Sequence, residues 1–139
     1  MAFVNLKKNE VQIKVVYYGP GRGGKTTNLK YIYNTFKDRI NGKMLAIKTQ
    51  GDRTLFFDFF PFDLGTINGF KIKVQLYTVP GQIKYNATRR LVLNGVDGIV
   101  FVADAMKARR QSNIYSLKNL YQNLKEYRKD IFRIPFVFQ

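Results

Sequence analysis

The sequence predicts a single α/β domain with a mostly parallel β-sheet, one antiparallel edge strand and helices on both faces. Three observations favour this class. β-rich and helical stretches alternate along most of the 139 residues. The run 98–104, GIVFVAD, is almost wholly apolar, as is typical of a strand buried on both faces. The dipeptide Asn68-Gly69 joins two β-rich runs as a hairpin, which accounts for the antiparallel edge.

The first half of the chain contains a strand, a helix and a second strand. The run 11–18 is β-rich and leads directly into the glycine cluster 19–24. Apolar side chains then recur at helical spacing, at Leu29, Ile32, Tyr33 and Phe36. Residues 40–53 contain turn dipeptides and predict a loop region with room for a short strand. Residues 54–64 are aromatic and strand-like, and Pro61 favours an edge position or an early end.

The second half continues the alternation. The run 71–78, KIKVQLYT, alternates apolar and polar residues and predicts the second arm of the hairpin. A short helix is predicted over 83–94, and an amphipathic helix over 112–129. The chain ends in IPFVFQ, which predicts a further strand over 134–139.

The composition excludes several kinds of catalysis and metal binding. The chain has no cysteine and no histidine, which excludes disulfides, thiolate chemistry, imidazole bases and the usual zinc ligands. No apolar run approaches the roughly 20 residues of a membrane-spanning helix. The first ten residues lack the apolar core of a signal peptide. We therefore expect a cytoplasmic protein without a transmembrane segment.

The formal net charge is +15, from 24 basic and 9 acidic residues. Such a charge favours attraction to nucleic acid or to an anionic membrane surface. A solvated basic surface, balanced by an acidic partner or by further sequence, explains it equally simply. No nucleic-acid motif accompanies the charge, so nucleic acid is not the partner we expect.

The strongest motif is GPGRGGKT at 19–26, an instance of G-x-x-x-x-G-K-[ST] between a predicted strand and a predicted helix. Glycines let backbone N–H groups approach phosphate oxygens, and the helix N-terminus attracts the same anion. Lys25 is expected to bridge the terminal phosphates, Thr26 to bind Mg²⁺ and Thr27 to contact the innermost phosphate. The predicted nucleotide-binding residues here are Gly19, Gly21, Arg22, Gly23, Gly24, Lys25, Thr26 and Thr27. The alternative is a glycine-rich turn that packs a helix against a strand.

A second motif is TVPGQ at 78–82, at the end of a predicted strand. Many nucleotide-hydrolysing proteins have Asp at the position of Thr78, where it helps to hold Mg²⁺. The Thr78 hydroxyl can hold only a metal-bound water, so we expect modest Mg²⁺ affinity and expect Thr78→Asp to tighten it. Gly81 is predicted to donate its N–H to the terminal phosphate, and Gln82 to orient the attacking water. Alternatively, Gln82 is an exposed polar residue on a loop.

Two carboxylates and an aromatic stripe have more than one interpretation. Asp58 and Asp104 are candidates to support Mg²⁺ through water, although such residues more often cap a helix or face solvent. The phenylalanines of 56–62 are mostly core residues, and part of this stripe is a candidate partner-binding face.

Four stretches, GPGRGGKTTNLKYIY, GDRTLFFDFFPFDLG, LYTVPGQIKYNATRR and LVLNGVDGIVFVADA, together resemble the bacterial small GTPases of the MglA type. The resemblance covers nearly the whole chain. The Thr in TVPG, together with LFFDF-PFDLG, is specific to this group within the Ras and Arf superfamily. It implies the P-loop small-GTPase fold and a cytoplasmic GTP/GDP switch that uses Mg²⁺. It also implies a Roadblock-type GTPase-activating partner similar to MglB, effector proteins of the motility or polarity machinery, and recruitment to the cell pole or inner membrane surface.

The resemblance also implies roles for single residues. Arg53 matches an intrinsic arginine finger, Thr54 matches the switch threonine that reaches Mg²⁺, and Gln82 matches the water-positioning glutamine. Gly21 matches a cradle glycine that does not tolerate a side chain. From the residues alone, Arg53 is one exposed arginine among many in a basic chain.

Guanine specificity in this superfamily usually comes from an Asn-Lys-x-Asp loop after the next strand, and the chain ends just before that position. We therefore expect one small-GTPase domain over 1–139, truncated before the base-recognition loop. Two other functions fit the sequence. One is a nucleotide-binding scaffold with negligible hydrolysis. The other is a basic protein that binds nucleic acid or a membrane surface.

Overall fold

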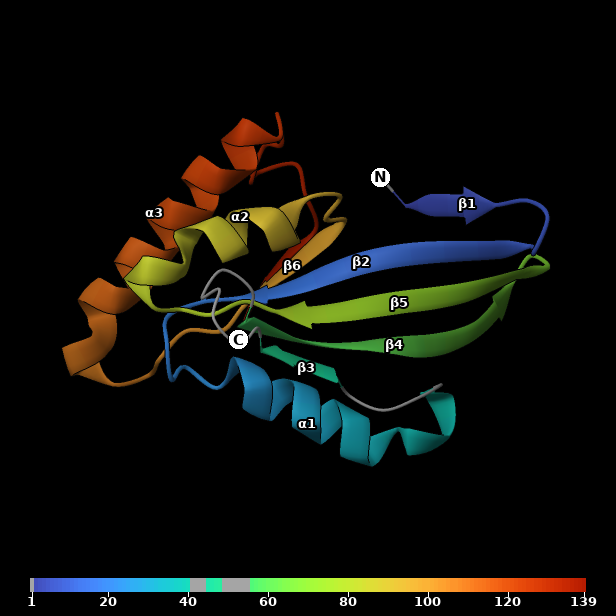
Figure 1. Ribbon diagram of the computed structural model, residues 1–139, viewed down its shortest axis with the longest axis horizontal. Helices are drawn as coiled ribbons and strands as arrows, with labels where there is room; N and C mark the ends of the chain where they lie inside the picture. Colours follow the sequence, from blue (N-terminus) through green and yellow to red (C-terminus); the bar gives the residue numbers. More distant parts are fainter. Residues whose placement is uncertain (1, 41–44, 49–55) are drawn as a thin grey trace.

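The structure is a computed structural model, which describes residues 2–40, 45–48 and 56–139. One β-sheet forms its centre, with α1 on one face and α2 and α3 on the other (Figure 1). The elements in chain order are β1 (Phe3–Asn5), β2 (Glu10–Tyr18), α1 (Lys25–Thr35), η1 (Lys37–Arg39), β3 (Leu45–Lys48), β4 (Phe56–Ile67), β5 (Phe70–Thr78), η2 (Ile83–Tyr85), α2 (Asn86–Leu93), β6 (Gly98–Phe101), η3 (Lys107–Arg109), α3 (Arg110–Glu126) and β7 (Phe136–Phe138). The predicted alternation of strands and helices is confirmed.

The strands of the sheet follow the order β3-β4-β5-β2-β6-β7. The four strands β5, β2, β6 and β7 pair in parallel, whereas β3 and β4 add antiparallel pairs at one edge. β1, which the sequence did not predict, pairs antiparallel with the first residues of β2, and β6 pairs with the last ones. The predicted class, a mostly parallel sheet with an antiparallel edge, is therefore confirmed.

The hairpin between β4 and β5 turns at Asn68 and Gly69, as predicted. Both residues have positive φ, 50° and 81°, which is the conformation of a primed two-residue turn. The expectation of an early end at Pro61 was wrong, because β4 continues to Ile67. The edge position was right, since β3 pairs only with residues 56–59, and Pro61 pairs only with β5 in the described part of the chain.

Two apolar clusters lie on opposite faces of the sheet, because successive side chains of a strand alternate between faces. Val16 and Tyr18 of β2 pack towards α2 and α3, and Tyr17 packs towards α1. The first cluster contains Val16, Tyr18, Val79, Val92, Leu93, Val96, Ile99, Phe101, Leu120 and Leu124. The second contains Tyr17, Leu29, Ile40, Phe60, Val74, Leu76 and Val102.

The parallel strands bring three loops to one edge of the sheet, the edge where ligands bind in open α/β folds. Residues 19–24 follow β2, residues 79–82 follow β5 and residues 102–106 follow β6. Val79 and Val102 continue the backbone hydrogen bonding to the end of β2, which keeps the three loops adjacent. This edge is where the predicted phosphate cradle and TVPGQ motif meet.

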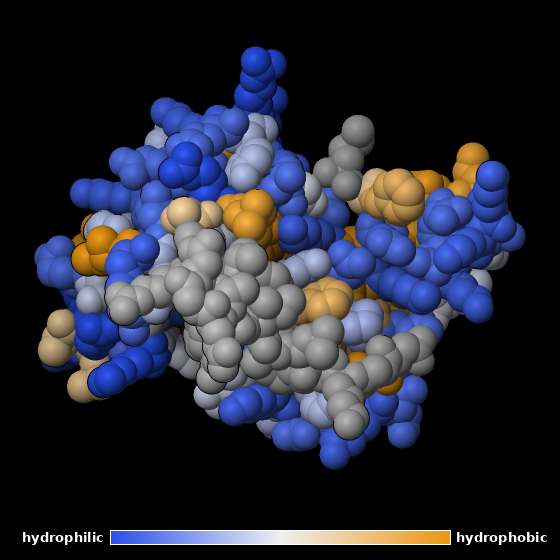
Figure 2. Space-filling view, in the orientation of Figure 1, coloured by the Kyte–Doolittle hydropathy of each residue, from blue (hydrophilic) through white to orange (hydrophobic). Residues whose placement is uncertain are grey.

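Among the residues coloured in Figure 2, most of the visible face is hydrophilic, and apolar side chains lie over β1 and at several separate places elsewhere. Phe3 and Leu6 are 61% and 73% exposed. Among the helices that the structure describes, none combines the length and apolar character needed to cross a membrane.

The packing between α3 and the sheet predicts that two leucines contribute very differently to the free energy of unfolding. Leu120 is fully buried, whereas Leu91 on α2 is 55% exposed. Leu120→Ala is expected to lower the free energy of unfolding by about 2–5 kcal/mol, because it leaves a cavity in the core. Leu91→Ala is expected to change it by less than about 0.5 kcal/mol. Urea unfolding of the two variants of the full-length protein measures both values, and equal losses would contradict this packing.

Candidate functional site

At this edge of the sheet, the loops after β2 and β5 line a cavity of about 610 Å³. Predicted site residues that line it are Gly21, Arg22, Gly24, Lys25, Thr26, Thr27, Thr78, Gly81 and Gln82. Tyr85 and Arg109, which the sequence did not single out, line it as well. Gly19 and Gly23 belong to the same loop and pack against the backbone of Val102. The structure thus brings both predicted motifs to one place.

Two glycines of the cradle are required by close packing. A Cβ at Gly19, where φ is +146°, would lie 2.2 Å from the carbonyl oxygen of Val102. A Cβ at Gly23 would lie 3.1 Å and 3.2 Å from the carbonyl oxygens of Pro20 and Val102. Gly24 has φ of +104° and precedes the first turn of α1. These positions keep the loop against the sheet and direct the N-terminus of α1 into the cavity.

The resemblance implies that position 21 does not tolerate a side chain, but the packing around Gly21 leaves space for a Cβ. A Cβ there would meet its nearest atoms, including Cγ of Gln82, at 3.8 Å, which is ordinary contact. The packing of this conformation therefore does not itself require glycine at position 21. Arg22 is exposed and has φ of 63°, so its backbone is in the left-handed region usually taken by glycine.

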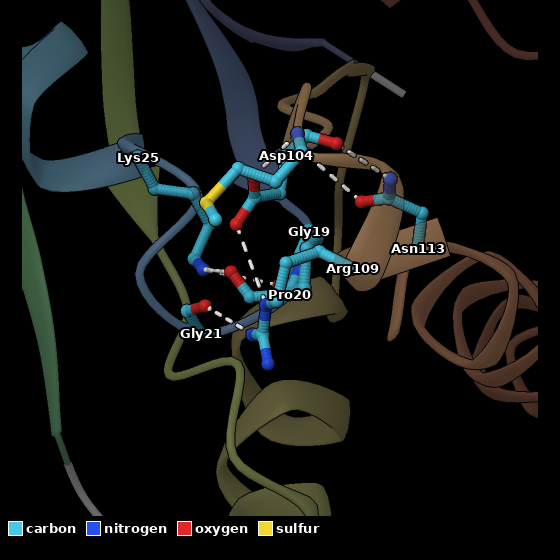
Figure 3. Close-up of polar contacts among 8 residues, drawn as sticks. Gly19, Pro20, Gly21, Lys25, Asp104, Arg109 and Asn113 are labelled. Carbon is cyan, nitrogen blue, oxygen red and sulfur yellow. Dashed lines mark hydrogen bonds and ion pairs between the residues drawn. The ribbon is translucent and has the colours of Figure 1, made fainter. Parts of the chain in front are cut away.

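Lys25 lies deep in the cavity, with 7% of its surface exposed. Its ammonium group donates hydrogen bonds to the carbonyl oxygens of Gly19 at 3.0 Å and Pro20 at 2.7 Å (Figure 3). Burial, together with the nearby positive charge of Arg89, lowers the pKa of Lys25 to about 8. A buried cation that donates to two neutral carbonyl oxygens is well placed to bind an incoming phosphate.

The carboxylate that the TVPGQ motif lacks is supplied by the neighbouring strand. Asp58 on β4 is buried, and its Oδ2 accepts hydrogen bonds from the hydroxyls of Thr26 at 2.6 Å and Thr78 at 3.0 Å. The Asp58 N–H in turn donates to the Thr78 hydroxyl at 2.9 Å. The two threonines and Asp58 therefore form one cluster, which we call the Thr-Asp-Thr cluster. From the sequence, Asp58 was only a minor candidate, because its pairing with the threonines depends on the register between β4 and β5.

The residues of the Thr-Asp-Thr cluster fit a magnesium ion. Mg²⁺ prefers oxygen ligands and is commonly bound by one or two protein groups together with substrate phosphates and water. The Thr26 hydroxyl donates a hydrogen bond to Asp58. The lone pairs of the Thr26 oxygen are therefore available to a cation. Asp58 adds the negative charge that Thr78 alone cannot provide.

The segment after β5 packs directly on the phosphate cradle. A Cβ at Gly81 would lie 2.0 Å from the Gly21 nitrogen and 2.4 Å from the carbonyl carbon of Pro20. Only glycine allows this approach of two backbones. The side chain of Gln82, the next residue, is exposed.

Arg109 reaches the cradle from the start of α3 (Figure 3). Its Nη2 donates to the carbonyl oxygen of Gly21 at 2.9 Å, and its Nε lies 3.4 Å from a carboxylate oxygen of Asp104. Asn113 fixes the Asp104 backbone through two hydrogen bonds of 2.9 Å. Asp104, considered for Mg²⁺ support, instead pairs with Arg109. No spacing in the sequence distinguishes Arg109 from the other arginines.

Comparison with known proteins decides the family. The chain is 53% identical, over all of its 139 residues, to the mutual gliding-motility protein MglA of Myxococcus xanthus (strain DK1622). It covers 71% of that protein. The chain belongs to the MglA family. No protein-family model matches it.

Membership of the MglA family confirms the resemblance found in the sequence and identifies the chain as a small GTPase. The sheet order and the helices on both faces agree with the predicted small-GTPase fold. Two MglA-type residues implied by the resemblance, Arg53 and Thr54, lie outside the described residues. Their roles, and those assigned to the residues of the cavity, therefore stay predictions.

The lowered pKa of Lys25 predicts that nucleotide affinity depends on pH. Burial lowers its pKa from 10.5 to about 8, so the ammonium loses its proton as the pH rises through about 8. Phosphate binds the protonated form, so affinity for GDP is expected to fall about tenfold between pH 7 and pH 9. Titration calorimetry of the full-length protein at each pH measures the change.

The matched variant is Lys25→Met, which has no titratable group at this position. It is expected to bind GDP weakly and to show no loss of affinity over the same pH window. An equal pH dependence in both proteins would assign the effect to another group and contradict the assignment to Lys25.

Proposed function

We propose that this small GTPase is a Mg²⁺-dependent molecular switch that hydrolyses GTP to GDP and phosphate and regulates cell polarity or motility. The observation that carries the proposal is the Thr-Asp-Thr cluster at a cavity that also contains a buried lysine. The name of the Myxococcus xanthus relative, a gliding-motility protein, supports the biological role.

The phosphates bind to the cradle through groups that this structure places around the cavity. Backbone N–H groups of 21–26 and the N-terminus of α1 attract the anion. Lys25 exchanges the carbonyl oxygens of Gly19 and Pro20 for phosphate oxygens. This exchange offsets the cost of burying the ammonium charge, because the anion is a stronger partner than two neutral carbonyls.

Thr26 would bind Mg²⁺ through its hydroxyl oxygen, and Asp58 would support the metal with its carboxylate, which Thr78 holds in place. Thr54 is proposed as a further ligand. The bound metal neutralises charge on the phosphate oxygens. The cluster thereby performs the task of the Asp found in many other nucleotide-hydrolysing proteins.

Hydrolysis requires Gln82 to orient the attacking water and Arg53 to stabilise the charge of the transferring phosphoryl group. The Gln82 side chain lines the cavity but is exposed to solvent, so its amide must be ordered before it can hold the attacking water. This requirement makes the reaction slow without a partner. We propose that a Roadblock-type activating protein, similar to MglB, orders both residues.

The GTP-bound form is proposed to bind effector proteins of the motility or polarity machinery. We place the protein in the cytoplasm, with recruitment to the cell pole or the inner membrane surface. The net charge of +15 favours contact with an anionic surface.

Single-turnover hydrolysis tests the proposal, with the full-length protein and with or without a Roadblock-type activating protein. Arg53→Ala is expected to lower the stimulated rate on the order of 10³-fold, since an arginine in cis stabilises the transition state to about this extent. Gln82→Leu is expected to abolish most of the stimulation, because leucine cannot hold the water.

The matched control is Arg133→Ala, since the Arg133 side chain is 89% exposed and is not among the residues that line the cavity. It should hydrolyse GTP at the wild-type rate. If Arg53→Ala and Gln82→Leu also keep the stimulated rate, the mechanism is wrong. Tight GTP binding with no turnover under any condition would instead support the nucleotide-binding scaffold.

A further inference from the structure

Arg89 is an unusual residue of the described chain, because its large, charged side chain is almost completely buried. It lies on α2 and is only 2% exposed. In the part of the chain that the structure describes, no carboxylate pairs with its guanidinium. A buried cation without an acidic partner is unfavourable unless its N–H groups are satisfied by other acceptors.

Three of these acceptors are backbone carbonyl groups of the segment Pro80–Ile83, which we call the switch segment. Nη1 of Arg89 donates to the carbonyl oxygens of Pro80, at 2.9 Å, and of Gln82. Nη2 donates to the carbonyl oxygen of Ile83 at 3.4 Å. One planar side chain therefore holds most of the backbone of this segment from the side of α2.

The same guanidinium is fixed by α3. Nε of Arg89 donates to Oδ1 of Asn119 at 2.8 Å, and the buried hydroxyl of Tyr18 donates to the same oxygen. Burial raises the pKa of Tyr18 to about 12, so the hydroxyl keeps its proton and acts as a donor. Asn119 and Asn123, one turn apart on α3, both donate to Oδ1 of Asn86, at 2.8 Å and 3.0 Å. The polar network ends at Tyr18, the residue before the phosphate cradle.

The switch segment is thus held from two sides. Gly81 contacts the backbone of the cradle on one side, and Arg89 binds the adjoining carbonyl groups on the other. The backbone of Gln82 lies between these contacts, and its position determines where the amide of Gln82 can reach. A lysine at position 89 would keep the charge but could not satisfy the same separated acceptors, because its donors lie on a single nitrogen.

We propose that Arg89 is a positioning residue for hydrolysis, which holds the backbone of the switch segment so that Gln82 can orient the attacking water. The inference rests on the proposed function, in which Gln82 performs that task. Arg89 acts through the carbonyl groups of the segment and through Asn119. It is distinct from Arg53, which is proposed to contact the phosphoryl group itself.

The chain offers a matched control in the next residue. Arg90 is also on α2, but its side chain is 44% exposed and pairs with Glu126 at 2.9 Å on the surface. Arg90→Lys makes the same chemical change as Arg89→Lys without touching the switch segment. None of the 139 residues is a tryptophan, so Ile83→Trp adds a fluorescent reporter to this part of the protein, at a side chain that is 69% exposed.

The experiment uses the full-length protein with the Ile83→Trp reporter, alone and combined with each lysine variant. Arg89→Lys is expected to bind GDP within about threefold of the parent and to hydrolyse GTP about 10- to 100-fold more slowly, because the catalytic amide is misplaced while binding is kept. Acrylamide should quench the introduced tryptophan more strongly in this variant. Arg90→Lys should match the parent in all three measurements.

Asn119→Ala provides a second, milder variant in case Arg89→Lys lowers the melting temperature too far for comparison. It removes the contact to Nε and leaves the carbonyl contacts, so it is expected to shift quenching and hydrolysis in the same direction by a smaller factor. Unchanged quenching together with unchanged hydrolysis, in a folded Arg89→Lys or Asn119→Ala variant, would overturn the proposal. A parallel loss of GDP affinity and hydrolysis would also overturn it, because a general structural role predicts that result.

Failure of the proposed function is distinguishable in the same experiment. If the parent protein does not hydrolyse GTP under any condition, the function proposed for the site is wrong. The quenching comparison then still decides whether Arg89 holds the switch segment. Gln82→Leu, measured beside the parent, sets the rate expected when the amide is lost altogether.

Discussion

The carboxylate of Asp58 is the group on which the arrangement of the site depends. It accepts hydrogen bonds from Thr26 at the start of α1 and from Thr78 at the end of β5, while it belongs to β4. Three elements that are distant in the sequence are therefore joined at one buried negative charge. The hairpin register between β4 and β5 matters for this reason, because a shift by one residue would turn Asp58 to the other face of the sheet.

The charges around the cavity explain why the site favours a phosphate and a cation together. Lys25 is a buried cation whose hydrogen bonds in the described structure go to carbonyl oxygens, and Arg109, which also pairs with Asp104, lines the same cavity. Asp58 provides negative charge beside them. A phosphate satisfies the cations, and Mg²⁺ satisfies the carboxylate, so each charge of the ligand finds an opposite charge already in place.

Sequence patterns predicted the parts of the structure that depend on local chemistry. The cradle at 19–26 and the turn at Asn68-Gly69 follow from backbone conformations that few residues adopt. The role of Asp58 could not be predicted in this way, because it depends on the contact between Asp58 on β4 and Thr78 on β5. Arg89 and Arg109 were missed for a related reason, since burial and tertiary position, rather than sequence spacing, distinguish them from the exposed arginines. β1 was missed because only three residues pair with β2.

The most direct test of the account moves the carboxylate from one strand to the next. Mg²⁺ affinity is measured by titrating the metal into the GTP complex of the full-length protein. Asp58→Thr is expected to weaken Mg²⁺ binding at least about tenfold, because the only carboxylate of the Thr-Asp-Thr cluster is lost. Adding Thr78→Asp to this variant should restore most of the affinity. Unchanged Mg²⁺ affinity in Asp58→Thr would contradict the claim that Asp58 supplies the missing charge.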